Sequence, residues 1–143
     1  MNPGPPRPTS LFHFQPRAAA GAFVLLAVEV YIALFVRDAW VRPYGGDLLA
    51  VVWVYCLLRS ALTLRSTTLA LAAFAVGAGV EVAQYLEVPR LLGLSRHPVL
   101  SVIAGTTFQW GDLLAYALGA ALAYGLDEGT SLLRCHAGAG SSA

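Results

Sequence analysis

The sequence predicts an all-α integral membrane protein, a bundle of about four transmembrane helices. Hydrophobic residues make up 57% of the 143 residues and charged residues only 12%, about half the charged fraction of a typical soluble domain. A soluble domain of this length leaves much of its surface in water, so lipid is expected to solvate the apolar surface of this chain. Four apolar stretches also have about the length, roughly 20 residues, that crosses the hydrocarbon core as a helix.

The predicted membrane domain covers residues 18–126, between an irregular N-terminal arm (1–17) and a flexible Gly/Ser-rich tail (127–143). The four spans are expected at about residues 18–36, 47–64, 68–86 and 107–126. The second and third spans are joined by so few residues that they must form an antiparallel hairpin. Between the third and fourth spans, the apolar stretch 98–104 is too short to cross and is expected to be an interfacial or re-entrant segment.

Four crossings place both termini on one side, which we predict to be the cytoplasmic side of a bacterial inner (plasma) membrane. The basic residues do not decide this orientation, because equal numbers of arginines border the two predicted faces. One face has Arg7, Arg17, Arg65 and Arg134, and the other has Arg37, Arg42, Arg90 and Arg96.

Composition also excludes several classes of partner. The net charge of +1 argues against nucleic-acid binding, which needs a clustered basic surface. Cys56 lies in an apolar stretch and Cys135 in the polar tail, so no disulfide is expected between them. No metal-ligand spacing occurs and no cofactor is expected. Membrane lipids are the expected partners.

Polar side chains within the spans are the strongest functional signal. A charge near the bilayer centre costs roughly 2.5–3.5 kcal/mol, so each one needs a reason. At the helical rise per residue, all the acids of the spans fall in the same half of the bilayer. Glu81 and Gln84 share one helix face, as do Asp112 and Tyr116. The candidate ligand-binding residues of this polar pocket are Glu29, Arg42, Asp47, Glu81, Gln84, Asp112 and Tyr116.

Structural roles compete with ligand binding at several of these positions. Asp47 follows two glycines and also suits an N-cap, where a carboxylate accepts amide hydrogens. Glu81 and Gln84 also suit hydrogen bonds that join helices. Glu29 has no capping role and must be neutral, paired or beside water. Arg59 lies toward the opposite face and is expected to extend its guanidinium to the nearby interface.

Small residues recur every four positions in the third and fourth spans. They are Ala73 and Gly77 in the third span, and Ala115, Gly119 and Ala123 in the fourth. Such stripes let helix backbones approach closely, so these two spans are expected to pack face to face. This packing would bring Glu81 toward Asp112.

Three sequence blocks carry a resemblance to a known family. In order along the chain they are Arg42 to Asp47, Val80 to Gln84 and Gly105 to Asp112. Together they resemble the bacterial multi-pass membrane family known as domain of unknown function 2809, over nearly all of residues 18–126. That resemblance implies a membrane fold and no particular activity.

The second half of the chain is also distantly similar to VanZ-like proteins. In those proteins a Glu-x-x-Gln element ends one helix and a later Asp precedes a small-residue helix, which match Glu81, Gln84 and Asp112 here. The similarity implies a link to the bacterial envelope and to glycopeptide resistance. The insert from Leu91 to Ala104 departs from the simplest VanZ spacing.

Three functions are compatible with this pattern. The favoured one is a non-catalytic envelope protein that binds a lipid or amphiphile head group in a polar pocket at one leaflet. The alternative is a small proton-coupled transporter or transporter subunit with Glu29 as a relay, in which a homo-oligomer would supply the missing repeat. A membrane enzyme acting on lipid-linked substrates, with two carboxylates as acid and base, is least favoured. No nucleophile–base pair or phosphate-binding loop accompanies the acids.

Overall fold

The chain is all-α in the computed structural model, which describes residues 11–38, 44–86, 88–91 and 110–139. These residues form four long helices and one short one: α1 (Pro16–Phe35), α2 (Gly46–Ala61), α3 (Ser66–Tyr85), α4 (Val88–Leu91) and α6 (Trp110–Ala139). The predicted fold class is therefore confirmed at the level of an all-α bundle. The expected interfacial segment at 98–104 lies outside the described residues.

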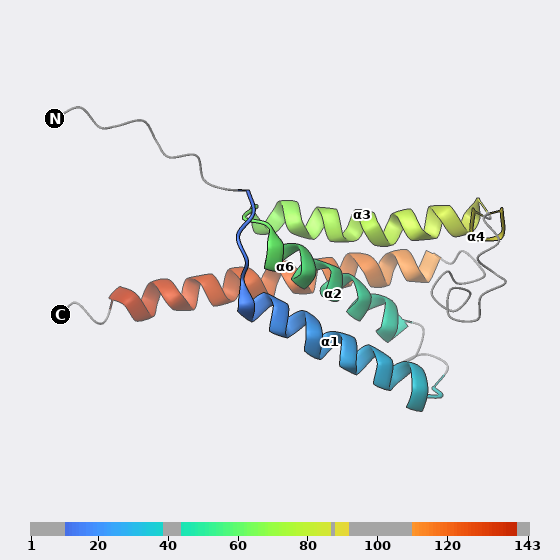
Figure 1. Ribbon diagram of the computed structural model, residues 1–143, viewed down its shortest axis with the longest axis horizontal. Helices are drawn as coiled ribbons and strands as arrows, with labels where there is room; N and C mark the ends of the chain where they lie inside the picture. Colours follow the sequence, from blue (N-terminus) through green and yellow to red (C-terminus); the bar gives the residue numbers. More distant parts are fainter. Residues whose placement is uncertain (1–10, 39–43, 87, 92–109, 140–143) are drawn as a thin grey trace.

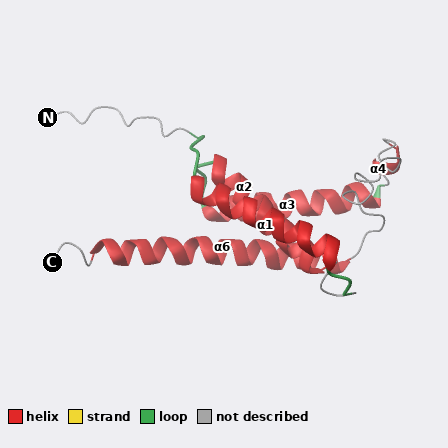
Figure 2. Cartoon of the chain, turned by 60° about the horizontal axis from the view of Figure 1, so that its bottom comes forward, coloured by secondary structure: helices red, strands yellow, loops and turns green. Residues whose placement is uncertain are grey.

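Helix α2 is the centre of the bundle. It packs against α1, α3 and α6, and α3 packs in turn against α6 (Figure 1). The buried core comes from α2, α3 and α6, with Val51, Tyr55, Leu69, Ala73 and Tyr116 among its members. Helix α1 covers α2 from outside this core, and α6 extends past the other helices toward the C-terminus (Figure 2).

Two helix ends differ from the sequence prediction for local reasons. Helix α1 begins at Pro16 rather than at residue 18, because proline suits the first turn, where its missing N–H is not needed. Helix α2 ends at Ala61 rather than at residue 64, because the following backbone pairs with the N-terminal arm. The His13 amide donates to the Ala61 carbonyl at 3.1 Å, and the Thr63 amide donates to the Leu11 carbonyl at 3.0 Å.

Helix α6 is longer than predicted. It continues to Ala139, whereas the sequence analysis ended the fourth span at Leu126 and expected a flexible tail from Asp127. No proline follows residue 98, so no residue blocks the helix. The glycines at 125 and 129 each cost about 1 kcal/mol of helix propensity, which weakens a helix without ending it. The helix therefore continues past Leu126, while the end of the membrane span at that residue stays a prediction.

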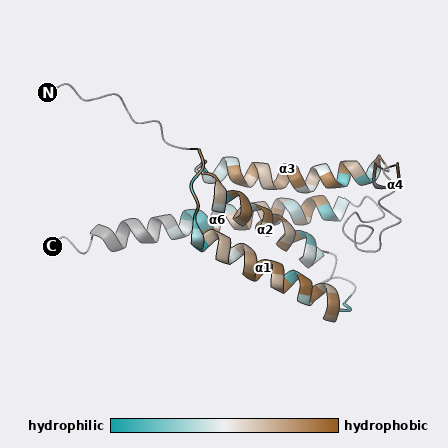
Figure 3. Cartoon of the chain, viewed as in Figure 1, coloured by the Kyte–Doolittle hydropathy of each residue, from teal (hydrophilic) through white to brown (hydrophobic). Residues whose placement is uncertain are grey.

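Among the described helices, α1 and α3 are long and apolar enough to cross a membrane. Helix α2 has 16 residues, fewer than the roughly 20 of a usual span. The outer face of α1 is apolar, with Phe23 75% and Leu34 68% exposed, while Glu81 is only 2% exposed inside the bundle. Figure 3 shows hydrophobic residues along most of α1. Acids inside and large apolar side chains outside reverse the distribution usual in water.

Candidate functional site: a buried carboxyl cluster

Four polar side chains meet where α2 and α6 begin and α3 ends. They are Asp47 from α2, Glu81 from α3, and Asp112 and Tyr116 from α6, and we call them the carboxyl cluster. The Tyr116 hydroxyl donates to Oε1 of Glu81 at 3.1 Å. Asp47 lies close enough to Asp112, Glu81 and Tyr116 for their charges and dipoles to act on its carboxyl group. Three helices therefore contribute polar side chains to one cluster.

Glycines allow the three backbones to come this close. A Cβ at Gly119 of α6 would lie 2.5 Å from the Leu48 carbonyl oxygen of α2, and a Cβ at Gly77 of α3 would lie 3.0 Å from the Tyr116 ring. The predicted contact between the third and fourth spans is confirmed, since α3 packs against α6. Gly119 faces α2, which the stripe of small residues did not predict.

The carboxyl cluster is rich in acids. Asp47 has Asp112, Glu81 and Tyr116 as its polar neighbours among the described residues, and no basic side chain is among them. Carboxyl groups that lie close together repel one another when both are ionised. Within the described part of the chain, no group of three or more His, Cys, Asp or Glu side chains is arranged to hold a metal ion.

Two of the predicted site residues, Glu29 and Gln84, do not join this cluster among the described contacts. A third, Arg42, lies outside the described residues. Glu29 is half-buried on α1, and its Oε1 is buried without a hydrogen-bond partner in the described part of the protein. Gln84 is half-buried on α3, and no described hydrogen bond links it to the acids. Asp47 is not the N-cap of α2, since Gly45 occupies that position and Asp47 lies in the first turn.

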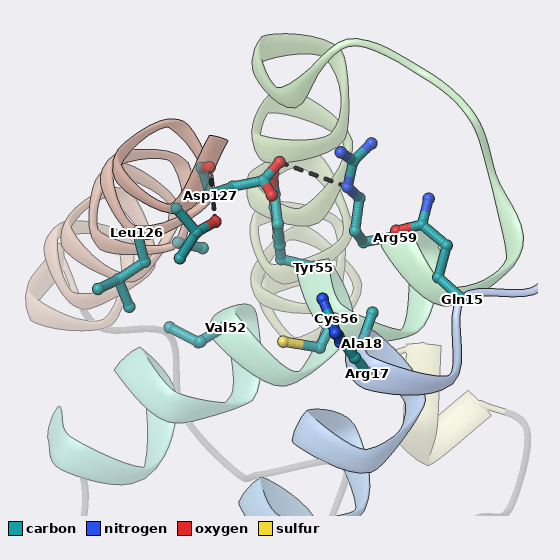
Figure 4. Close-up of a pocket in the computed structure, with 11 residues that line it drawn as sticks. Gln15, Arg17, Ala18, Val52, Tyr55, Cys56, Arg59, Leu126 and Asp127 are labelled. Atoms are coloured by element: carbon teal, nitrogen blue, oxygen red, sulfur yellow. Dashed lines mark hydrogen bonds and ion pairs between the residues drawn. The ribbon is translucent and has the colours of Figure 1, made fainter. Parts of the chain in front are cut away.

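A second polar group, at the opposite end of the core, was missed by the sequence analysis. Oδ2 of Asp127 accepts hydrogen bonds from the Tyr55 hydroxyl at 2.7 Å and the Ser66 hydroxyl at 2.8 Å. Nε of Arg59 lies 3.4 Å from the same oxygen (Figure 4). We call these four residues the Asp127 cluster, and it ties α2, α3 and α6 together. The ion pair between Arg59 and Asp127 was not predicted, and the extension of Arg59 to the interface stays a prediction.

One signal in the sequence pointed to the Asp127 cluster. In an antiparallel bundle the end of the second span, the start of the third and the end of the fourth lie at the same end. Arg59 and Asp127 occupy these positions with opposite charges. Because the predicted fourth span ends at Leu126, Asp127 falls in the predicted tail. Its pairing with Arg59 was therefore not predicted.

A pocket of about 300 Å³ lies beside the Asp127 cluster, between the start of α1, the second half of α2 and α6. Its lining includes polar side chains, among them Gln15, Arg17 and Arg59, and apolar ones such as Val52 and Leu126 (Figure 4). Cys56 is a half-buried free thiol on its wall. The pocket is separate from the carboxyl cluster, since it contains none of that cluster's members.

Comparison with known families identifies the chain. Neither the curated proteins nor the solved structures give a match. A family described as "Protein of unknown function (DUF2809)" matches residues 36–120, a range that contains all four members of the carboxyl cluster. The resemblance to this family is therefore confirmed over residues 36–120, while its bacterial and multi-pass character and the similarity to VanZ-like proteins stay predictions. Because the match covers more than half of the chain, this protein belongs to the DUF2809 family.

Proposed function

We propose that this chain is a multi-pass protein of the bacterial inner membrane, and that its carboxyl cluster binds the positively charged head group of a lipid or other amphiphile. All four long helices would cross the bilayer, with the shorter α2 enclosed by its neighbours. The membrane part of the proposal is supported by the length and apolar character of α1 and α3. It is also supported by the burial of Glu81 and Asp112 inside a bundle whose outer face is largely apolar.

The ligand is proposed from one observation: the acids Asp47, Glu81 and Asp112 gather at one end of the bundle, and no basic side chain is among the described groups that act on Asp47. Asp127 provides a contrast within the same protein, because Arg59 balances its charge. The negative charge of Asp47 and Asp112 attracts a cation, and an amine head group carries that charge and would displace a proton held by these carboxyl groups. Apolar side chains beside the cluster in sequence, Val82 and Leu114, are 54% and 63% exposed and offer a surface for the ligand's hydrocarbon tail.

Native mass spectrometry of the detergent-purified protein tests this ligand class. The wild type is expected to retain hexadecylamine in preference to hexadecanol. Its retention of the amine is expected to increase as the pH rises, because the amine and the proton compete for the same carboxylates. The double variant Glu81→Gln, Asp112→Asn is expected to bind the amine at least about tenfold more weakly, or roughly 1.4 kcal/mol.

Glu128→Gln is the matched control, because it removes an acid beside Asp127 rather than in the carboxyl cluster. It is expected to leave hexadecylamine retention unchanged. Equal retention of the amine by the wild type and the double variant would overturn the proposed ligand.

Proton-coupled transport is the second candidate, and the same gathering of Asp47, Glu81 and Asp112 favours it, because neighbouring carboxyl groups inside a membrane can relay protons. Reconstituted vesicles distinguish the two functions. A transporter would move protons or amines down an imposed gradient, and Asp112→Asn would stop that movement. A protein that only binds head groups would show the retention described above and no flux.

The number of crossings is tested by labelling single cysteines in a cysteine-free background. Asp38 follows α1, and Arg65 lies between α2 and α3. If every long helix crosses the bilayer, cysteines at these positions are accessible from opposite sides. An impermeant maleimide applied to intact and to opened cells is the measurement. Labelling of both positions from the same side would show that α2 does not cross.

A further inference from the structure

We propose that the pocket beside the Asp127 cluster binds the phosphate group of an anionic phospholipid. Its volume of about 300 Å³ is at the small end for ligand sites, large enough for a head group and too small for acyl chains. Arg17 and Arg59 both line it, against the single carboxylate of Asp127. The charged side chains of the lining therefore sum to one positive charge, the opposite of the carboxyl cluster.

Two contacts hold the Arg59 side chain in place and leave other N–H groups of its guanidinium available to a ligand. Its Nε lies against Asp127 at 3.4 Å, and its Nη1 donates to the Leu64 carbonyl at 3.2 Å. Its Nη2 has no hydrogen-bond partner among the described residues. A guanidinium has five N–H donors in a rigid fork that suits phosphate oxygens, so these two contacts leave donors for a ligand. Because the side chain is already fixed, little conformational freedom remains to be lost on binding.

Arg17 supplies the second positive charge. It lies in the first turn of α1, is exposed, and makes no described hydrogen bond or ion pair. Arg17 on α1 and Arg59 on α2 line the same pocket (Figure 4). Two arginines around one cavity are the usual means of holding a phosphate through charge-assisted hydrogen bonds.

The pocket is also amphipathic, which points to a lipid rather than to free phosphate. Gln15 and Arg59 lie on one side of it, and Val52 and Leu126 lie on the other (Figure 4). Arg17 is near the start of α1 and Arg59 near the end of α2, so a membrane-spanning bundle would place both near the interface. Basic pockets between transmembrane helices at this depth suit anionic lipid head groups. This inference rests on the proposed membrane location and not on the ligand of the carboxyl cluster.

Lipid competition on the full-length protein tests the inference. The protein is exposed in detergent to equal amounts of phosphatidylglycerol and phosphatidylcholine with the same acyl chains, and bound lipid is read by native mass spectrometry. The wild type is expected to retain phosphatidylglycerol preferentially. Arg17→Gln is expected to weaken that retention about fivefold, the effect of one basic side chain near a membrane surface. The control Arg65→Gln removes an exposed arginine that does not line the pocket and is expected to change nothing.

Cys56 gives a second readout that does not depend on lipid surviving in the mass spectrometer. In a Cys135→Ser background, phosphatidylglycerol is expected to slow alkylation of Cys56 in the wild type and less so in Arg17→Gln. The site is overturned if the wild type retains the two lipids equally. It is also overturned if Arg17→Gln and Arg65→Gln reduce the retention of phosphatidylglycerol equally. Protection of Cys56 by inorganic phosphate as complete as that by phosphatidylglycerol would assign the pocket to free phosphate instead.

The variants separate this inference from the proposed function. Glu81→Gln with Asp112→Asn is expected to lose hexadecylamine and keep phosphatidylglycerol. Arg17→Gln is expected to do the reverse, so either ligand assignment can fail while the other stands.

Discussion

Replacing Asp127 with alanine is expected to lower the free energy of unfolding by about 3 kcal/mol. Most of the loss comes from Tyr55, which is 4% exposed and would keep a buried hydroxyl without its acceptor, at a cost of about 1–3 kcal/mol. The ion pair with Arg59 adds less than about 1 kcal/mol, because both side chains are partly exposed to solvent. Heating the detergent-solubilised protein while following the reactivity of Cys56 measures the change.

Asp127→Asn is the graded control for this experiment. An asparagine keeps one side-chain oxygen that can accept from Tyr55 or Ser66, and it loses only the charge. Its destabilisation is expected to be clearly smaller than that of Asp127→Ala. If Asp127→Ala unfolds at the same temperature as the wild type, the Asp127 cluster does not hold α2, α3 and α6 together.

Gly119→Ala is expected to destabilise the bundle by about 1–3 kcal/mol, the usual cost of overpacking a core. The added methyl group would lie 2.5 Å from the Leu48 carbonyl oxygen and 3.3 Å from Cβ of Val51. The first of these atoms belongs to the backbone, so relief requires α2 and α6 to move apart. Because Tyr116 is one turn away, the same movement is expected to loosen its hydrogen bond to Glu81 and weaken ligand binding at the carboxyl cluster.

Gly125→Ala on the same helix is the matched control. No atom lies within 4 Å of a Cβ built at Gly125, so alanine there adds helix propensity without a clash. It is expected to leave stability unchanged or to raise it by up to about 1 kcal/mol. Equal behaviour of the two variants in the Cys56 assay would mean that close contact between α2 and α6 does not limit stability.

The carboxyl cluster was only partly predictable from sequence. Counting residues from the loops placed Asp47, Glu81 and Asp112 at similar depth, and the stripes of small residues paired the third and fourth spans. Depth does not give the direction in which a side chain faces around its helix. Glu29 was therefore grouped with the same acids, although no described contact joins it to them.

The Asp127 cluster was not predicted from the sequence. The Gly/Ser-rich composition predicted a flexible tail from Asp127, yet α6 continues to Ala139. The hydrogen bonds that hold Asp127 come from Tyr55 and Ser66, which are 72 and 61 positions away along the chain. Local composition carries no information about partners so distant.

By itself, the sequence determined the all-α class, the approximate positions of the long helices and the membership of the DUF2809 family. These follow from apolar run lengths and from short motifs, which are local properties of the chain. Only the tertiary structure decided which acids share hydrogen bonds, which arginine is paired, and that a pocket lies at the end opposite the carboxyl cluster. Those contacts depend on the rotation of each helix about its axis, and that rotation is set by packing between helices.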